Sequence, residues 1–173
     1  MIFKKKRDDK DIFALPSASI SLDIKLGLKS SNRAAICIKE SSGNFRYALD
    51  EIRGFFEVSK ELSYREVKDR YGYIWFIITA DGIEELVASI DAIADIVIEH
   101  GFEDNILAAI FEFVNSHKMY LFYRFKSKRF YPFIPYDSNR NVDEEMRVYA
   151  VMKKELPMEE DMEKWYPIWN MPL

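Results

Sequence analysis

The chain has 173 residues, which is enough for one domain that buries roughly two-thirds of the surface its unfolded form exposes. With 49% hydrophobic and 31% charged residues, its composition is that of a globular protein and excludes the disordered class. A net charge of -4 provides no general attraction for nucleic acid, and the single cysteine, Cys37, excludes an intramolecular disulfide.

The N-terminus, residues 1–11, is predicted to be a frayed, charged end. Its basic run from Lys4 to Arg7 is followed at once by Asp8 and Asp9, where a signal peptide would need an apolar segment. No apolar run reaches the roughly 20 residues that span a bilayer. We therefore predict a cytoplasmic protein without a transmembrane segment, whose basic N-terminus could contact the inner face of the membrane peripherally.

The segment 18–28 carries two opposing signals. Its apolar residues alternate strictly, which is typical of a strand, yet Pro16 and Gly27 stand where they could open and close a helix. Both interpretations stay open. Residues 33–39 are predicted to form a strand in which Cys37 is a buried, inert thiol.

The next elements are predicted from helical periodicity and from turn residues. Residues 44–60 place their apolar side chains on one helical face, and residues 83–99 do so over a longer stretch that ends at Gly101. Between them, residues 62–68 and 73–79 predict a hairpin that turns near Gly72. The second arm is apolar on both faces, so we expect it inside the sheet.

Three apolar and aromatic runs between residues 106 and 136 are separated by short polar breaks, which predicts consecutive antiparallel strands. The first run is apolar on both faces and is either a central strand or the start of a buried helix. In the middle run, Met119, Leu121, Tyr123 and Phe125 share the face that we expect to meet the core. The third run contains Pro132, which cannot donate to a ladder and therefore predicts an edge strand.

The opposite face of these runs mixes aromatic rings with cations and is our candidate interaction surface. Its members are Tyr120, Phe122, Arg124, Lys126, Arg129, Tyr131 and Phe133. This face is either partly covered by the chain itself or a binding surface. RNA-binding sheets have similar rings and cations, but their basic, glycine and aromatic order is missing here and the chain is acidic, so we predict no nucleic-acid partner.

The C-terminal part is predicted to form one helix and an irregular tail. The helix, residues 142–155, would end before Pro157. Its predicted docking residues are Val142, Met146, Tyr149, Met152 and, just after the helix, Leu156. The tail, residues 159–173, has as its candidate contact residues Trp165, Tyr166 and Trp169. Because exposed tryptophan is costly, we expect the tail to dock on its own domain or on a partner.

Residues 33–114 follow the order strand, helix, hairpin, helix, strand. This order predicts a single α+β domain over residues 1–173, a two-layer sandwich with helices on one face of an antiparallel sheet. Its core would be ferredoxin-like, with strand and helix additions at the C-terminal end. The alternative is a secretion-chaperone-like α+β fold.

No catalytic motif is present. His100 and His117 are not at zinc spacing, the glycines form no nucleotide-binding loop, and no nucleophile has the context needed for acyl transfer. Glu112, inside an apolar strand, is either a solvent-facing or cation-paired glutamate or a catalytic acid. We predict no metal, no cofactor and no enzyme.

Several stretches together resemble one known family, the PspA-associated PspAB proteins of archaea and actinobacteria. They are IFALPSASISLDIKLGL, RAAICIK, HGFEDNILAAIFEF, RFYPFIPYDSNRN and LPMEEDMEKWYPIWNMPL, and the most specific lie at 130–135 and 165–169. The resemblance supplies no catalytic or ligand residues. It implies association with a PspA-like coiled-coil protein of a membrane-stress system or with an HtpX-like membrane protease.

From these observations we predict a non-enzymatic adaptor or regulator of a PspA-type envelope-stress system. The alternative is a protein that binds a small molecule or lipid headgroup in a pocket between the sheet and the tail. An exposed edge strand, such as the one containing Pro132, offers a route to a homo-oligomer.

Overall fold

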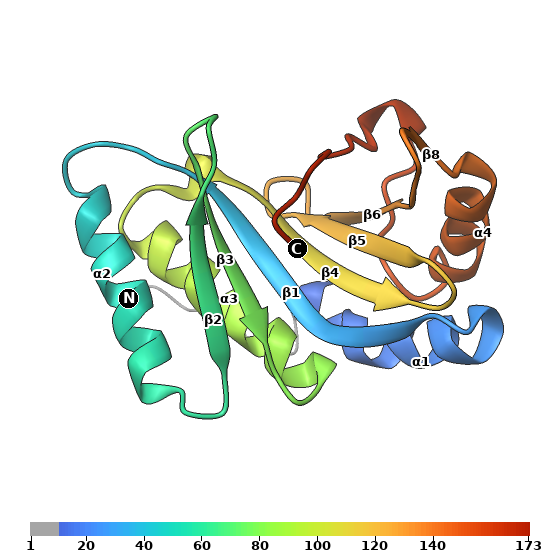
Figure 1. Cartoon of the computed structure of the whole chain (residues 1–173), viewed down its shortest axis with the longest axis horizontal. Helices are drawn as coiled ribbons and strands as arrows, with labels where there is room; N and C mark the ends of the chain where they lie inside the picture. The colour runs from blue at the N-terminus through green and yellow to red at the C-terminus, as the bar shows by residue number, and fades with distance from the viewer. Residues whose placement is uncertain (1–10) are drawn as a thin grey trace.

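The computed structural model describes residues 11–173, in which six strands form one antiparallel sheet in the order β2-β3-β1-β4-β5-β6 (Figure 1). The strands are β1 (Lys29–Lys39), β2 (Ser63–Lys68), β3 (Tyr73–Thr79), β4 (Ile106–Val114), β5 (Lys118–Arg124) and β6 (Arg129–Phe133). A short pair, β7 (Pro135–Tyr136) and β8 (Asn139–Arg140), stands apart. The first four strands have the order of a ferredoxin-like unit, and β5 and β6 extend it, as the sequence predicts.

The helices are α1 (Leu15–Leu26), α2 (Phe45–Val58), α3 (Ile83–Glu99) and α4 (Val142–Met152). All four contribute to the apolar core on one face of the sheet, through side chains such as Leu22, Ile52, Ile90 and Val148. The predicted two-layer sandwich is therefore confirmed. None of these helices is long and apolar enough to cross a bilayer, a statement that covers residues 11–173.

The segment whose pattern left helix and strand open is the helix α1. Pro16 lies in its first turn, and Gly27 follows its end with a left-handed φ of 64°, its N–H bonded to the Asp23 carbonyl. Leu22 is buried, whereas Ile24 is 79% exposed. The apolar residues that alternate in the sequence therefore lie on both the buried and the exposed side of a helix. Pro16 and Gly27, which mark its two ends, correctly indicated a helix.

The second face of the sheet is covered by the C-terminal tail instead of helices. Figure 1 shows this segment, in dark red, in front of the strands. Beneath it lies a second apolar cluster, made of Ala35, Cys37, Trp75, Ile77, Ala108, Ile110, Tyr120, Phe122, Tyr131, Phe133 and Trp165. Burial raises the pKa of the Cys37 thiol, with a smaller contribution from Asp69, so the reactive thiolate is disfavoured.

Helix α4 docks through a stripe that matches the predicted one only in part: Met152 is buried and Tyr149 is half-buried, as expected for docking residues. Val142 and Met146, expected to be buried, are 45% and 37% exposed, and the buried positions are Glu145, Val148 and Met152. The prediction left out Glu145, since a charged side chain is unfavourable in an interior unless it is paired. Its partner, Arg140, lies outside the helix and brings this charge into the interior.

Candidate interaction surface

The tail starts by closing one edge of the sheet. The Phe130 N–H donates to the Pro157 carbonyl over 2.9 Å, and the Glu159 N–H donates to the Phe130 carbonyl over 2.7 Å. Arg129 adds a hydrogen bond of 3.1 Å to the Met158 carbonyl. The outer side of β6, the Pro132 strand, is therefore already bonded at Phe130 by the chain's own tail.

Trp165 is the buried anchor of the tail. Its side chain is 3% exposed, and its indole Nε1 donates to the Glu159 carbonyl over 2.8 Å. Its own carbonyl accepts a 2.7 Å hydrogen bond from Arg140 Nη1. The polar atom of the ring is thus satisfied while the ring itself fills the second cluster.

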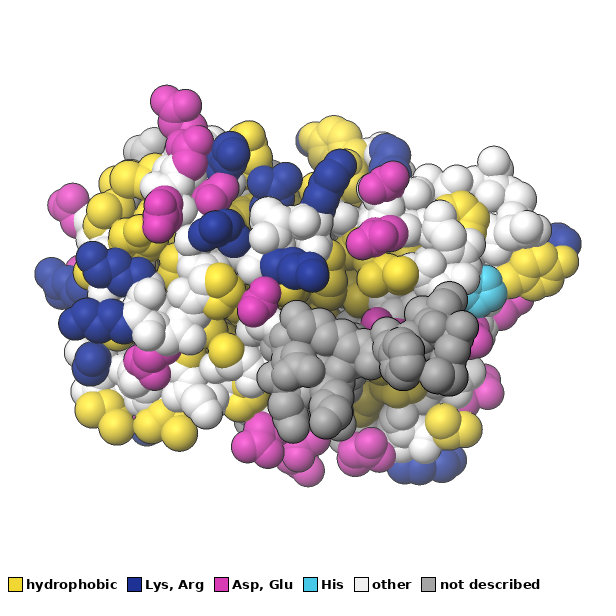
Figure 2. All heavy atoms as spheres, turned by 180° about the vertical axis from the view of Figure 1, so that it is seen from behind, with side chains coloured by type: hydrophobic (Ala, Val, Ile, Leu, Met, Phe, Trp, Pro, Cys, Tyr) yellow, Lys and Arg dark blue, Asp and Glu magenta, His cyan; other side chains and the backbone are white. Residues whose placement is uncertain are grey.

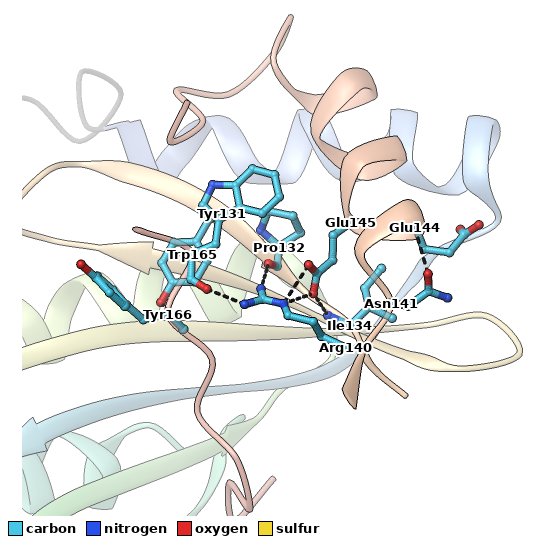
Figure 3. A network of polar contacts seen from close by, with 9 residues as sticks. All are labelled: Tyr131, Pro132, Ile134, Arg140, Asn141, Glu144, Glu145, Trp165 and Tyr166. Atoms are coloured by element: carbon cyan, nitrogen blue, oxygen red, sulfur yellow. Dashed lines mark hydrogen bonds and ion pairs between the residues drawn. The ribbon is translucent and has the colours of Figure 1, made fainter. Parts of the chain in front are cut away.

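Arg140 connects three parts of the chain, as Figure 3 shows. Its Nε lies 2.9 Å from both carboxylate oxygens of Glu145 on α4, and Oε2 also accepts the Ile134 N–H over 2.9 Å. The guanidinium additionally lies 5.3 Å from the centre of the Phe133 ring. Burial raises the pKa of Glu145, and the hydrogen bonds from Ile134 and Arg140 act in the opposite direction.

Two tail rings contact the predicted sheet surface directly. The Tyr131 hydroxyl donates to the Tyr166 carbonyl over 2.9 Å, and the Arg124 guanidinium lies 5.6 Å from the Tyr166 ring centre. The Phe133 and Trp169 rings meet edge to face at 5.1 Å. Tyr166 and Trp169 remain 53% and 44% exposed.

These contacts join two sets of residues that the sequence suggested separately. The four sheet rings, Tyr120, Phe122, Tyr131 and Phe133, are buried under the tail and are not presented at the outer surface. Arg124 is half-buried, whereas Lys126 and Arg129 are exposed. The accessible residues of the two predicted sets are Arg124, Lys126 and Arg129 from the sheet side and Tyr166 and Trp169 from the tail. We call these five residues the tail surface.

A family model described as PspA associated protein B matches residues 3–173. This chain belongs to that family. Comparison with curated proteins and with solved structures gave no significant match. The match extends over both the β5-β6 hairpin and the tail, so the tail surface lies within the region shared by the PspAB family.

Glu112 of this PspAB member is paired with cations. It is buried, accepts a 2.7 Å hydrogen bond from the Ser31 hydroxyl, and lies 3.6 Å from Arg33 and 3.5 Å from Lys118. Burial, aided by the Glu112 charge, raises the pKa of Tyr120 to about 12. Glu112 is therefore a buried, cation-paired strand glutamate and does not face solvent.

A small open cavity of about 190 Å³ lies between the sheet and the tail. Its lining consists of Tyr120, Phe133, Pro135, Ile168, Trp169, Asn170 and Met171. Asn170 has a left-handed φ of 59°, so the tail bends where it borders the cavity. Within residues 11–173, no three His, Cys, Asp or Glu side chains are grouped as metal ligands.

The far side of the molecule carries a mixture of charged and apolar side chains (Figure 2). Figure 2 shows that side, where acidic and basic side chains are interspersed and apolar side chains are scattered among them outside the grey atoms. The predicted basic membrane contact at Lys4 to Arg7 lies outside the described residues. The tail surface is therefore the candidate interaction site that the described residues support best.

Proposed function

We propose that this protein is a non-enzymatic interaction module that binds a PspA-type protein through the tail surface, as an adaptor or regulator of a PspA-type membrane-stress system. Membership of a family named for association with PspA is the observation that carries the choice of partner. The tail surface supplies a place for the contact. The proposal includes a location on the cytoplasmic side of the membrane.

The geometry of the tail surface suits binding. Aromatic and arginine side chains contribute most to the affinity of protein interfaces. Tyrosine and tryptophan bury large areas with little loss of side-chain freedom, and arginine forms several directed hydrogen bonds. The Tyr131 hydroxyl fixes the backbone carbonyl of Tyr166, the Arg124 guanidinium lies 5.6 Å from the Tyr166 ring centre, and the Trp169 ring contacts Phe133. These contacts restrain the tail before a partner arrives, which lowers the entropic cost of binding. Arg124, Lys126 and Arg129 would attract an acidic partner surface.

The test is direct titration of the purified chain with the PspA-type protein from the same genome, followed by calorimetry. We expect binding that is weakened at least about tenfold by Tyr166→Ala combined with Trp169→Ala. The matched control is Tyr47→Ala combined with Tyr71→Ala, two exposed tyrosines on α2 and on the β2-β3 turn, which should bind as the wild type does.

The two possible failures are distinguishable. If the wild type shows no affinity, a PspA-type partner is wrong for this chain. If both double variants bind equally well, the partner stands and the tail surface is the wrong site. An HtpX-like membrane protease, the other partner implied by resemblance, is tested by the same titration in detergent.

A second candidate function is favoured by the cavity between sheet and tail. Three aromatic residues, Tyr120, Phe133 and Trp169, border it, and its volume of about 190 Å³ suits a small headgroup more than a drug-sized ligand. A thermal-shift series with phosphocholine, phosphoethanolamine and glycerol phosphate tests this function. A rise in melting temperature that disappears in Trp169→Ala would support it, and no rise with any of the three would exclude this ligand class.

A further inference from the structure

The two edges of the sheet differ. The β6 edge is bonded to the tail, whereas β2 is the terminal strand on the other side and, within residues 11–173, pairs only with β3 (Figure 1). All residues of β2 except Val67, which is half-buried, are exposed. An open edge of this kind presents a row of peptide groups able to pair with another strand.

The direction of those peptide groups follows from the hairpin. The Asp69 N–H donates to the Tyr73 carbonyl over 2.9 Å, which makes this pair a hydrogen-bonded one. Hydrogen-bonded and non-hydrogen-bonded pairs alternate along an antiparallel ladder. Counting back along the observed register, the peptide groups of Tyr64, Glu66 and Lys68 therefore point outward, away from β3.

We propose that two copies of this chain pair through β2, antiparallel and around a two-fold axis at Val67. In this register, Glu66 of each copy faces Lys68 of the other, and the two Val67 side chains meet at the axis. Each Glu66-Lys68 pair exchanges two backbone hydrogen bonds, since both residues point their peptide groups outward. The two sheets become one continuous sheet with the helices of both copies on the same side.

Charge order selects this register. Charged residues on an edge strand usually discourage pairing, but opposite charges placed directly across a ladder stabilise it. Shifting the axis to Glu66 would bring two carboxylates face to face, and shifting it to Arg65 would bring two guanidinium groups together. Only the axis at Val67, among these three, sets opposite charges opposite each other.

The charges involved already belong to networks within each copy. Glu66 accepts from Arg53 over 2.9 and 2.8 Å, and Lys68 is ion-paired with Glu40. In the dimer, Lys68 would lie between Glu40 of its own copy and Glu66 of the other. The inference is independent of the proposed function, because it rests on the β2 edge and not on the tail surface.

Cross-linking tests the register. At the axis, the two Cα atoms of residue 67 would lie about 4.5 Å apart, within the range that a disulfide spans. Val67→Cys should therefore form a covalent dimer under mild oxidation. In the matched control, Arg65→Cys, the introduced thiols sit on Cα atoms separated by four residue steps, about 13 Å, and should not cross-link. The native Cys37 is fully buried and does not compete.

Charge reversal tests the pairing without a covalent bond. Glu66→Lys and Lys68→Glu should each weaken self-association about tenfold in sedimentation experiments. The double variant should recover part of the loss, because opposite charges again face each other across the axis although the pairs with Arg53 and Glu40 within each copy are lost. Circular dichroism of each variant shows whether the fold is intact. A wild type that stays monomeric, cross-linking of Arg65→Cys as readily as Val67→Cys, or a double variant no better than the single ones would overturn the proposal.

Discussion

Arg140 Nε lies 2.9 Å from both carboxylate oxygens of Glu145, and this ion pair joins β8 to α4 beneath the tail. Glu145 is 1% exposed, so its charge depends on Arg140 and on the Ile134 N–H for compensation. The same guanidinium holds the Trp165 carbonyl. Arg140 thus connects the buried first turn of α4 to the C-terminal tail that covers the sheet.

Removing Arg140 should be strongly destabilising. Arg140→Ala leaves the Glu145 carboxylate buried without its cation, which we expect to lower the free energy of unfolding by about 3–5 kcal/mol in urea denaturation. Arg147→Ala, on the helix that carries Glu145, is the matched control. Arg147 pairs with Glu144 at the surface, so its loss should cost less than about 1 kcal/mol. Equal losses in the two variants would contradict this account.

The destabilisation caused by Arg140→Ala should depend on pH. A group whose pKa is raised by folding stabilises the protein at low pH, and this contribution is lost as the pH rises through the folded-state pKa. The pKa of Glu145 is raised already, and Arg140→Ala removes a contact that opposes the rise. The variant should therefore be less destabilised at about pH 4 than at about pH 7. Urea titrations of both proteins across this range measure it, and a constant difference would exclude Glu145 as the cause.

The two tail tryptophans should differ in their effect on stability. Trp165→Ala empties a buried site and should cost about 3–5 kcal/mol. Trp169→Ala removes a ring that is 44% exposed and should cost less than about 1.5 kcal/mol. Thermal unfolding followed by circular dichroism compares the two. If Trp165→Ala were as stable as Trp169→Ala, the tail would not be an integral cover of the sheet.

Replacement by alanine should change the stability of the protein in opposite directions at two glycines. Gly27 ends α1 with a φ of 64°, so Gly27→Ala should destabilise the protein by about 1 kcal/mol. Gly54 lies inside α2 with no atom within 4 Å of an added Cβ, and Gly54→Ala should stabilise it by about 0.5–1 kcal/mol. Chemical denaturation of both variants tests the pair. The same sign of change in both would show that backbone conformation is not the deciding factor.

Several elements followed from the sequence because their signals are local. The helical stripes of α2 and α3, the hairpin around Gly72 and the alternation in β5 each depend on residues a few positions apart. Their type and order were sufficient for the ferredoxin-like sandwich, since few topologies accommodate that order. In α1, Pro16 and Gly27 correctly marked the two ends of a helix, whereas the alternation of apolar residues between them was misleading. Which of those residues are buried depends on how the helix packs against the core, and that packing involves segments distant in the sequence.

Tertiary structure alone decided what covers each face. Alternation showed that Tyr120 and Phe122 share a side of the sheet, but what covers that side depends on the tail, more than 30 residues away. The burial of Glu145 also depends on a residue outside its helix. Glu145 lies on the same face of α4 as Val148 and Met152, and it can be buried there because Arg140 compensates its charge. Periodicity reports which side chains share a face, whereas the burial of that face depends on distant segments meeting in space. The candidate site, built by the tail on the sheet, is therefore a property of the tertiary structure.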